Sequence, residues 1–378
     1  MNIERIVDLK RELVKKSCFL LGPRQTGKSW LIRHSLKGCP TYNLLDSDIY
    51  LKLSRSPRRL REELSPKDRI VVIDEIQKLP QLLDEIHLLI EEKRIHFLLT
   101  GSSARKLRRG GVNLLGGRAR THYFHPFSYW ELKERFHLLR ALNHGLLPSL
   151  YFSEDPEKDL EAYVGTYLKE EVAAEGLTRN VPAFSRFLEV AALCNGRLIN
   201  YEKISNDAQV ARSTVQEYFQ ILKDTLLARE VVPWRKSKKR KPISTSKFYF
   251  FDPGVVRFLQ NRNLLKKGSH EFGEAFETYI FHELKTFADY RSAGEISYWR
   301  STSGYEVDFI LDDTTAIEVK ASATVGLQDL KGLKALQEEK SLKRYVVVSL
   351  EDQVRTVGSI QILPWKEFLR RLWEEELI

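Results

Sequence analysis

A glycine-rich turn near the start of the chain constrains the fold more than any other feature. The short apolar segment 17–21 leads into a G-x-x-x-x-G-K-S pattern, and an amphipathic segment follows it. A strand, a glycine-rich turn and a helix in this order form a P-loop, whose backbone N–H groups surround phosphates at the positive end of the helix. The pattern predicts a nucleotide site made by Gly22, Pro23, Arg24, Gln25, Thr26, Gly27, Lys28, Ser29 and Trp30.

The last two residues of the pattern have separate predicted roles. Lys28 is expected to reach the β- and γ-phosphates of ATP, and the Ser29 hydroxyl is expected to hold Mg²⁺.

A second strand, predicted at 41–45, ends in Asp46. A third predicted strand runs from Arg69 through Ile-Val-Val-Ile to two acids. Its continuous apolar run is typical of a central parallel strand that is buried on both faces.

The two acids at the end of this third strand complete the predicted ATPase site. Asp74 is expected to hold Mg²⁺, and Glu75 is expected to polarise the attacking water. An ordinary buried strand that ends in a turn is the alternative interpretation.

A further strand at 96–103 ends in Thr100, Ser102 and Ser103. One of these residues could sense the γ-phosphate, or they could simply end the strand. Arg118 is a candidate arginine finger or sensor, or a surface arginine. Residues 3–15 have near-helical apolar spacing and predict a helix.

Composition limits the setting and the partners of the chain. Its 378 residues suggest two to four domains, with no apolar run of the roughly 20 residues that a membrane helix needs. Because such a run is missing, we expect no membrane association. The three cysteines are far apart and match no zinc or disulfide spacing, which favours a reducing cytoplasm. The net charge of +10 and the pI near 9.3 favour a polyanionic partner.

A winged helix-turn-helix pattern follows a mostly helical segment. Two predicted helices, one at 184–194 and one opening at Ser213 with a Ser213–Gln216 capping box, precede strands at 228–234 and 247–251. Between the strands lies a run that is basic at six of seven positions. A solvated basic loop is the default interpretation, and phosphate contact at a wing tip is the alternative that we favour. The predicted DNA-binding residues are Arg212, Thr214, Gln216, Gln220, Arg235, Lys236, Lys238, Lys239, Arg240 and Lys241.

The C-terminal segment predicts a second kind of catalytic site. A helix at 271–287, strands at 295–300, 305–311 and 315–321, a helix at 327–338 and a strand at 344–349 have the order of the PD-(D/E)XK nuclease core. Side chains alternate along a strand, so Glu318 and Lys320 are expected on one face. With Asp308 on the neighbouring strand and Glu277 on the helix, these carboxylates predict Mg²⁺ or Mn²⁺ binding, and Lys320 would act on the attacking water. Val307 replaces the proline that names the superfamily, and an inactive structural copy is the alternative.

Several separate runs together carry a family resemblance. Gly-Pro-Arg-Gln-x-Gly-Lys-Ser, Ile-Asp-Glu-Ile-Gln at 73–77, Leu-Thr-Gly-Ser-Ser at 99–103 and Pro-Phe-Ser at 126–128 resemble the bacterial and archaeal AAA+ ATPases of the AAA_14 type with a C-terminal DUF4143 domain. The resemblance implies an α/β chain with an AAA+ core, a helical lid, a winged helix and a nuclease-like α/β domain. The boundaries expected are 1–125, 126–180, 181–262 and 263–378. A ring or another homo-oligomer is implied as well.

Three functional classes compete at this point. The first is an ATP-driven protein that remodels or translocates on DNA, for example branched DNA, and carries a metal-dependent nuclease. The second is a nucleotide-switched DNA-binding regulator with an inactive nuclease domain. The third is a defence or signalling ATPase whose partner is a protein. ATPase activity stimulated by DNA would favour the first class.

Overall fold

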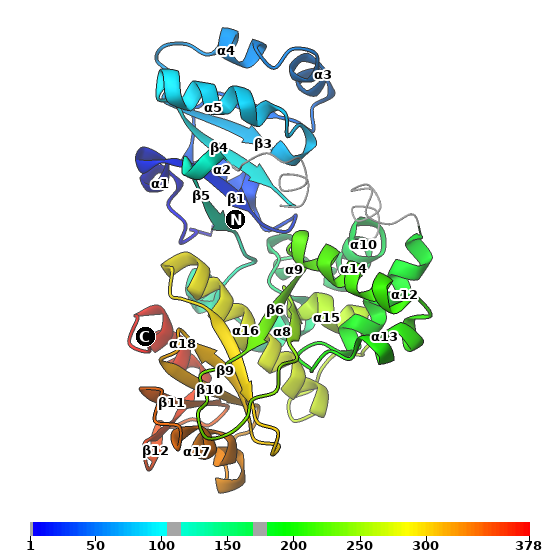
Figure 1. The fold of residues 1–378 in the computed structure, drawn as a ribbon, viewed down its shortest axis with the longest axis vertical. Coiled ribbons are helices and arrows are strands. Elements are labelled where there is room, and N and C mark those ends of the chain that lie inside the picture. Colours follow the sequence, from blue (N-terminus) through cyan, green and yellow to red (C-terminus); the bar gives the residue numbers. More distant parts are fainter. Residues whose placement is uncertain (1–2, 104–114, 169–179) are drawn as a thin grey trace. The chain divides into compact units, whose positions relative to one another are not determined.

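The computed structural model describes residues 3–103, 115–168 and 180–378. The chain divides into two compact units, which are described separately below. The first unit comprises residues 1–126 with 224–227, and the second comprises residues 127–223 with 228–378 (Figure 1). Among the described residues, no helix is long and apolar enough to cross a membrane.

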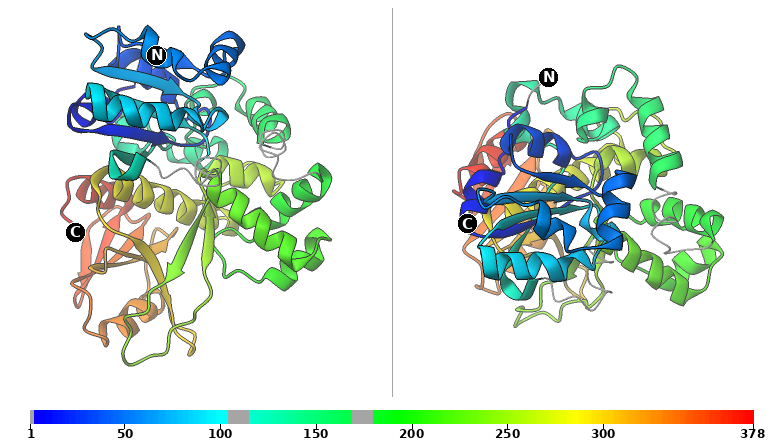
Figure 2. Two further views of the ribbon diagram at one scale, coloured as in Figure 1. Left: turned by 45° about the horizontal axis from the view of Figure 1, so that its top comes forward. Right: turned by 90° about the horizontal axis from the view of Figure 1, so that it is seen from above.

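The first unit is built on a five-stranded parallel sheet. Its strand order is β2-β3-β4-β1-β5, and its strands are β1 (Ser17–Leu21), β2 (Thr41–Asn43), β3 (Ile70–Asp74), β4 (His96–Gly101) and β5 (Ala119–Tyr123). The apolar runs of β1, β3 and β4 are buried because helices cover both faces of the sheet. Helix α5 (Leu82–Lys93) lies on one face, and α1 (Leu9–Lys15) and α2 (Lys28–Ser35) lie on the other (Figure 2). Two short helices, α3 (Ser47–Arg55) and α4 (Arg59–Glu63), connect β2 to β3.

The N-terminal helix is shorter than its apolar spacing predicts. It begins at Leu9, because the Asp8 side chain caps it by accepting from the Arg11 N–H. Residues 3–7 are not helical, so the prediction of a helix from residue 3 is wrong. Arg5 in this segment is buried, and its guanidinium donates to the carbonyl oxygens of Thr26 and His125 at 2.8 and 2.7 Å. These tertiary contacts hold the segment outside the helix.

The second unit begins with short helices and a three-helix cluster. The short helices are α7 (Tyr129–Leu132), α8 (Leu138–His144), α9 (Pro148–Tyr151), α10 (Pro156–Ala162) and α15 (Pro253–Leu259). The cluster consists of α12 (Val181–Leu193), α13 (Tyr201–Ala208) and α14 (Arg212–Asp224), and its aromatic rings pack together around Phe187. Helix α14 begins one residue before Ser213, so Ser213 is in the helix and not at the capping position that the sequence predicts.

An eight-stranded mixed sheet forms the rest of the second unit. The strand order is β12-β13-β11-β10-β9-β8-β6-β7. The strands are β6 (Ala228–Pro233), β7 (Lys247–Phe250), β8 (Ile296–Arg300), β9 (Glu306–Leu311), β10 (Thr315–Lys320), β11 (Arg344–Ser349), β12 (Arg355–Val357) and β13 (Ile360–Pro364). Helix α16 (His270–Arg291) stacks Phe281 on Tyr249 and Phe309, whereas α17 (Lys331–Gln337) packs on a core with Trp299 and Val347. Helix α18 (Trp365–Trp373) follows β13.

The two strands predicted as a wing are part of this large sheet. β6 pairs antiparallel with β7, and Val232 and Pro233 of β6 pair parallel with Ser297 and Tyr298 of β8. A boundary near residue 262 therefore separates strands that lie in one sheet. Sequence periodicity identified the strands, but it contains no information on which distant strand lies next to β6.

Candidate functional sites

The P-loop has the backbone that its glycines permit. Gly27 lies at φ 96° directly before α2, in the left-handed region that favours glycine. A Cβ atom at Gly22 would lie 2.2 Å from the carbonyl oxygen of Phe124, so only glycine fits between β1 and the segment after β5. The Thr26 hydroxyl donates to the Pro23 carbonyl at 2.8 Å and closes the turn.

The Lys28 side chain lies inside this turn. It is 6% exposed, and its ammonium donates to the carbonyl oxygens of Gly22 and Pro23 at 2.7 and 2.9 Å. The cation is therefore held within the loop whose N–H groups are expected to surround phosphate. Arg24 and Trp30 are half-buried, and Gln25 and Ser29 are exposed.

Asp74 connects the P-loop helix to the neighbouring strand. Its Oδ2 atom accepts from the Ser29 hydroxyl at 3.4 Å, and its Oδ1 atom accepts from the Thr100 hydroxyl. Strand β4 lies between β1 and β3 in the sheet, so Thr100 reaches Asp74 directly. The Ser29 hydroxyl and the Asp74 carboxylate thus present adjacent oxygen donors, the kind of ligand that Mg²⁺ prefers.

Glu75 has an unusual backbone and a defined side-chain position. Its φ of 62° lies in the left-handed region, which a non-glycine residue adopts at a cost of about 1–3 kcal/mol. Its N–H donates to the Thr100 hydroxyl at 3.3 Å. The Nε2 group of Gln77 donates to the Glu75 carboxylate at 2.5 Å and to the Ser102 hydroxyl at 3.2 Å. Gln77 belongs to the Ile-Asp-Glu-Ile-Gln run at 73–77, but no role of its own was predicted for it.

One predicted and one unpredicted arginine have defined positions in the first unit. Arg118 directly precedes β5, whose first residue pairs with Ser17 at the start of β1, so it lies at the end of the sheet opposite the P-loop. Arg118, the candidate finger, is about one-third exposed and pairs with Glu91 of α5; its side-chain contacts that the structure defines are to Glu91 and the Gly116 carbonyl. A role in a neighbouring subunit's site therefore stays a prediction. Arg5 was not predicted, yet it is buried against the P-loop through Thr26, and its guanidinium lies 4.0 Å from the Phe124 ring centroid.

The C-terminal candidate residues meet where two strands separate. β9 and β10 pair as far as Ile317 and Phe309, and the ladder ends before Glu318 and Asp308. Asp308 Oδ2 accepts from the Val319 N–H at 2.8 Å, in place of a backbone carbonyl. Lys320 Nζ lies 2.7 Å from Glu318 Oε1, so these two side chains share a face as the alternation predicts. The fork between the strands brings Asp308 and Glu318 into one site.

The carboxylates of Glu277 and Asp308 interact electrostatically. Burial, and next the Asp308 carboxylate, raise the pKa of Glu277 to about 7. Burial and Asp308 also raise the pKa of Glu318 well above its ordinary value. Glu318 Oε2 is buried and has no hydrogen-bond partner among the described residues. Carboxyls that raise one another's pKa are a common feature of functional sites.

Three residues at this site were missed by sequence analysis. Lys247 of β7 is buried, and its ammonium lies 2.6 Å from Glu306 Oε1. Burial alone would lower the pKa of Lys247, but the carboxylates of Glu277, Asp308 and Glu306 raise it. The Tyr249 hydroxyl donates to Glu277 Oε1 at 2.5 Å. One feature of the sequence could have indicated this site: Lys247 is the first residue of a strand whose other residues are aromatic.

Each of these carboxylates is turned toward a donor of the protein. Glu277 accepts from Tyr249, Asp308 from the Val319 N–H, and Glu318 lies against Lys320. Across the described part of the chain, no group of three or more His, Cys, Asp or Glu side chains is arranged to hold a metal ion. The three predicted metal ligands Glu277, Asp308 and Glu318 therefore do not form such a group in the structure.

The predicted DNA-binding face of α14 is accessible to solvent. Arg212, Gln216 and Gln220 are exposed and Thr214 is half-buried, whereas Val215, Phe219 and Leu222 are buried. The buried and the exposed residues of α14 thus lie on the faces that the hydrophobic spacing predicts.

The basic run does not form a free wing tip. The backbone N–H groups of Lys238, Lys239 and Arg240 donate to the Glu339 carboxylate at 2.6–3.0 Å. The Arg240 side chain donates to the Ala335 carbonyl and pairs with Glu338. Lys236 pairs with Asp313 at 2.6 Å. The segment is anchored beside α17 by its backbone, and the side chains of Arg235, Lys236, Lys238, Lys239 and Lys241 are exposed.

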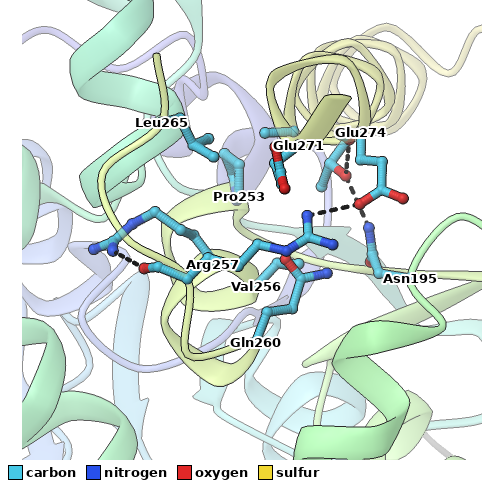
Figure 3. Close-up of a pocket in the computed structure, with 11 residues that line it drawn as sticks. Asn195, Pro253, Val256, Arg257, Gln260, Leu265, Glu271 and Glu274 are labelled. Atoms are coloured by element: carbon cyan, nitrogen blue, oxygen red, sulfur yellow. Dashed lines mark hydrogen bonds and ion pairs between the residues drawn. The ribbon is translucent and has the colours of Figure 1, made fainter. Parts of the chain in front are cut away.

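A small polar pocket lies between α15 and α16 (Figure 3). Its volume is about 10 Å³, which is room for one water molecule at most. Arg262 donates to Glu274 at 2.6 Å, and Asn195 donates to Thr278 at 2.8 Å across it. These contacts join the segments that follow α12 and α15 to α16.

Comparison with protein families agrees with this division of the chain. Residues 14–133 match the family described as AAA domain, and residues 272–368 match the domain of unknown function DUF4143. Along the chain, the segment that matches the AAA domain therefore precedes the segment that matches DUF4143. This is the order that its motifs predict, so the predicted resemblance is confirmed. Residues 135–266, between the two, match another domain of unknown function, DUF8612.

Two mycobacterial proteins are similar to this chain over most of its length. An uncharacterized protein of Mycobacterium bovis and one of Mycobacterium tuberculosis are each 24% identical over 372 residues, which is 94% of this chain and 83% of theirs. Among solved structures, the Aeropyrum pernix ORC1 protein in complex with DNA aligns over 69% of this chain and 92% of that chain, with 13% identity and a TM-score of 0.28. A STAND ATPase of Pyrococcus horikoshii aligns over 77% of this chain and 48% of that chain, with 14% identity and a TM-score of 0.21.

Proposed function

We propose that the AAA domain hydrolyses ATP and that the protein couples hydrolysis to remodelling of, or movement along, DNA. The observation that carries the ATPase proposal is the convergence of the P-loop and β3. Lys28 lies in the turn, and Ser29 and Asp74 are in hydrogen-bond contact. Glu75 follows directly, with its carboxylate held by Gln77.

The roles of these residues follow from their positions. The P-loop N–H groups and Lys28 bind the phosphates, and Ser29 and Asp74 would hold Mg²⁺, which neutralises charge on the phosphate oxygens. Glu75 accepts a proton from the attacking water as the water oxygen bonds to the γ-phosphorus. The bond from that phosphorus to the bridging oxygen then breaks, and ADP and phosphate form.

Two substitutions test the ATPase proposal. Lys28→Ala should abolish or greatly weaken ATP binding, measured by titration with a fluorescent ATP analogue. Glu75→Gln should bind ATP but hydrolyse it about 10²–10⁴-fold more slowly, because the group that accepts the proton is lost. Wild-type turnover by Glu75→Gln would contradict this assignment. The exposed residue Glu92 offers a control, since Glu92→Gln should change neither quantity.

DNA is the proposed partner because exposed cations lie on two parts of the second unit. Arg212 is exposed on α14, and the segment 235–241 presents further exposed lysines. Stimulation of the ATPase by DNA tests the coupling. Slow turnover that is indifferent to DNA would instead favour a nucleotide-switched regulator or a signalling ATPase.

We also propose that the DUF4143 domain is a metal-dependent nuclease. The observation that favours it is the strand fork, where Asp308 accepts from the Val319 N–H, Lys320 pairs with Glu318, and Glu318 Oε2 has no hydrogen-bond partner within the described residues. Asp308 and Glu318, with Glu277 nearby, would hold Mg²⁺ or Mn²⁺, which activates water and stabilises charge on the scissile phosphate. Lys320 orients the water.

Cleavage assays on single-stranded, duplex and four-way DNA test the nuclease proposal. Asp308→Ala and Lys320→Ala should each abolish cleavage and leave ATP hydrolysis intact, because that site lies in the other unit. Cleavage that persists in both variants would contradict the proposal. Exposed Lys343→Ala serves as the matched control for Lys320.

A further inference from the structure

A large groove in the second unit has no role in the sites described above. Its volume is about 1230 Å³, and it lies between α7, the start of α8 and the segments that follow β11 and β13. Aromatic and aliphatic side chains form much of its wall. These include Tyr129, Trp130, Phe136, Phe272, Leu350 and Trp365.

The groove adjoins the strand fork through the register of the sheet. Lys320 of β10 is paired with Ser349 of β11, and Ser349 is paired with Pro364 of β13, all in parallel. Leu350 and Trp365 directly follow these partners, so they extend beyond the same edge of the sheet as Lys320. Neighbouring strands lie about 4.8 Å apart, which places the start of α18 roughly 10 Å from the β10 backbone.

Helix α16 closes the same end of the sheet. A Cβ atom at Gly273 would lie 4.0 Å from the Ala321 Cβ, and Ala321 follows Lys320. Phe272, beside Gly273, lines the groove. The groove and the fork are therefore neighbouring parts of one surface.

Three of the rings that line the groove lie against one another. The Trp365 ring centroid lies 5.7 Å from that of Tyr129 and 5.6 Å from that of Phe136. All three residues are half-buried. Rings of this kind stack on unpaired nucleic-acid bases without regard to sequence, whereas bases in a duplex are already stacked on one another.

The charges around the groove suit a phosphate backbone. Lys133, Lys267 and Lys366 are exposed, and Lys366 Nζ lies 5.6 Å from the Trp365 ring centroid. Two of the acids are neutralised by ion pairs, Glu351 with Arg355 and Glu367 with Arg370 and Arg371. Of the other charged residues described here, the three lysines are exposed, as are two acids, Glu134 and Asp352.

We propose that this groove binds a single-stranded segment of nucleic acid. The segment would lie next to the scissile phosphate that the proposed nuclease site holds at the strand fork. The inference rests on the proposed nuclease function and deepens it, because it names a substrate with an unpaired flank. Trp365 stacks on a base, and Lys366 contacts a neighbouring phosphate.

Binding without cleavage tests the groove alone. The probe is a fluorescein-labelled oligothymidylate of roughly 12 nucleotides, compared with a duplex of equal length, in EDTA and without nucleotide, and read by anisotropy. Trp365→Ala should weaken single-strand binding about 10-fold and leave duplex binding unchanged, since stacking on one base is worth that much. Trp365→Phe should retain most of the single-strand affinity.

A second variant keeps the test valid if Trp365→Ala is poorly folded. Exposed Lys366→Glu should lower single-strand affinity and reduce its salt slope by about 0.7 per lost phosphate contact. Phe152→Leu, an aromatic residue outside the groove, is the matched control. Single-strand affinity that is unchanged in both groove variants would overturn the proposal and leave the groove to a protein segment. An equal loss for duplex would overturn it too.

The same experiment separates this inference from the nuclease proposal. Asp308→Ala should bind the oligonucleotide like the wild type and fail to cleave. If cleavage persists in Asp308→Ala while Trp365→Ala loses single-strand affinity, the nuclease assignment falls and the groove assignment stands. If the affinities do not depend on Trp365 while Asp308 is needed for cleavage, the reverse holds.

Discussion

Single side chains in the AAA domain are held by neighbours that the sequence motifs do not name. Gln77 bonds both the Glu75 carboxylate and the Ser102 hydroxyl, and Thr100 bonds both Asp74 and the Glu75 N–H. Thr100 thus holds Asp74 in place directly, and Ser102 acts on Glu75 through Gln77. Of the three candidate phosphate sensors, Thr100 and Ser102 have this positioning role in the structure.

The contact between Gln77 and Glu75 leads to a prediction about catalysis. Gln77→Ala should lower kcat for ATP hydrolysis by about 10-fold and leave KM nearly unchanged, because a misplaced proton acceptor slows the chemical step without weakening ATP binding. Steady-state kinetics with varied ATP measure both constants. Exposed Gln81→Ala is the control. A faster Gln77→Ala variant would mean that the amide restrains Glu75 in an inactive position.

At the scale of elements, the segment between β6 and β7 combines a fixed backbone with exposed charges. One carboxylate, Glu339, accepts three successive N–H groups of the segment and is itself 6% exposed. Burial raises the pKa of Glu339, but the N–H bonds outweigh it, and the pKa is lowered overall. The backbone is thus ordered before any DNA contact, which reduces the entropy lost on binding.

This arrangement allows the charges of the segment to be tested separately from its anchoring. Replacing Lys238, Lys239 and Lys241 with alanine should weaken duplex binding and reduce the salt slope by about 0.9 for each lost phosphate contact. The thermal unfolding midpoint should not change, because the anchoring contacts of Lys238 and Lys239 that the structure defines come from their backbones. Binding isotherms over a range of salt concentrations measure the slope.

The anchoring carboxylate provides the control for that prediction. Glu339→Ala should lower the free energy of unfolding by about 1–3 kcal/mol, because three N–H groups lose their acceptor, while all the cations remain. A salt slope that is unchanged after the triple lysine substitution would remove this segment from the DNA interface.

At the scale of the whole second unit, one buried acid joins three helices. Glu283 of α16 is fully buried, accepts from the Tyr129 N–H at 2.6 Å and accepts from the Trp373 indole at 3.1 Å. Burial raises the pKa of Glu283 from 4.5 to about 7, although these hydrogen bonds act in the opposite direction. The folded unit therefore holds a proton on Glu283 that the unfolded chain releases at lower pH.

Stability should consequently depend on pH in a defined direction. The folded state binds more protons than the unfolded state between pH 4.5 and about 7, so this contribution is present below pH 4.5 and is lost as pH rises to about 7. The loss corresponds to about 3 kcal/mol. Urea unfolding of wild type and Glu283→Gln across this range should show a steeper decline for the wild type.

A substitution on the surface controls for general effects of pH. Exposed Glu295→Gln should follow the wild-type curve at every pH. Parallel curves for the wild type and Glu283→Gln would show that the carboxyl of Glu283 does not take up a proton on folding.

The sequence by itself determined the local features of this protein. The P-loop, the acids that end β3, and the Glu318–Lys320 alternation depend on residues that are close in the chain, and short-range steric and hydrogen-bond rules specify such patterns. The strands of the C-terminal sheet were predicted for the same reason, whereas α18 and the strands β12 and β13 were not.

Only the tertiary structure decided which distant residues meet. Arg5 reaches the P-loop across 21 residues, Lys247 reaches Glu306, and the basic segment is anchored by Glu339 about 100 residues later. β6 joins the large sheet through β8, which removed the free wing. These contacts depend on which surfaces bury apolar area and satisfy polar groups together, and no periodicity within a single segment contains that information.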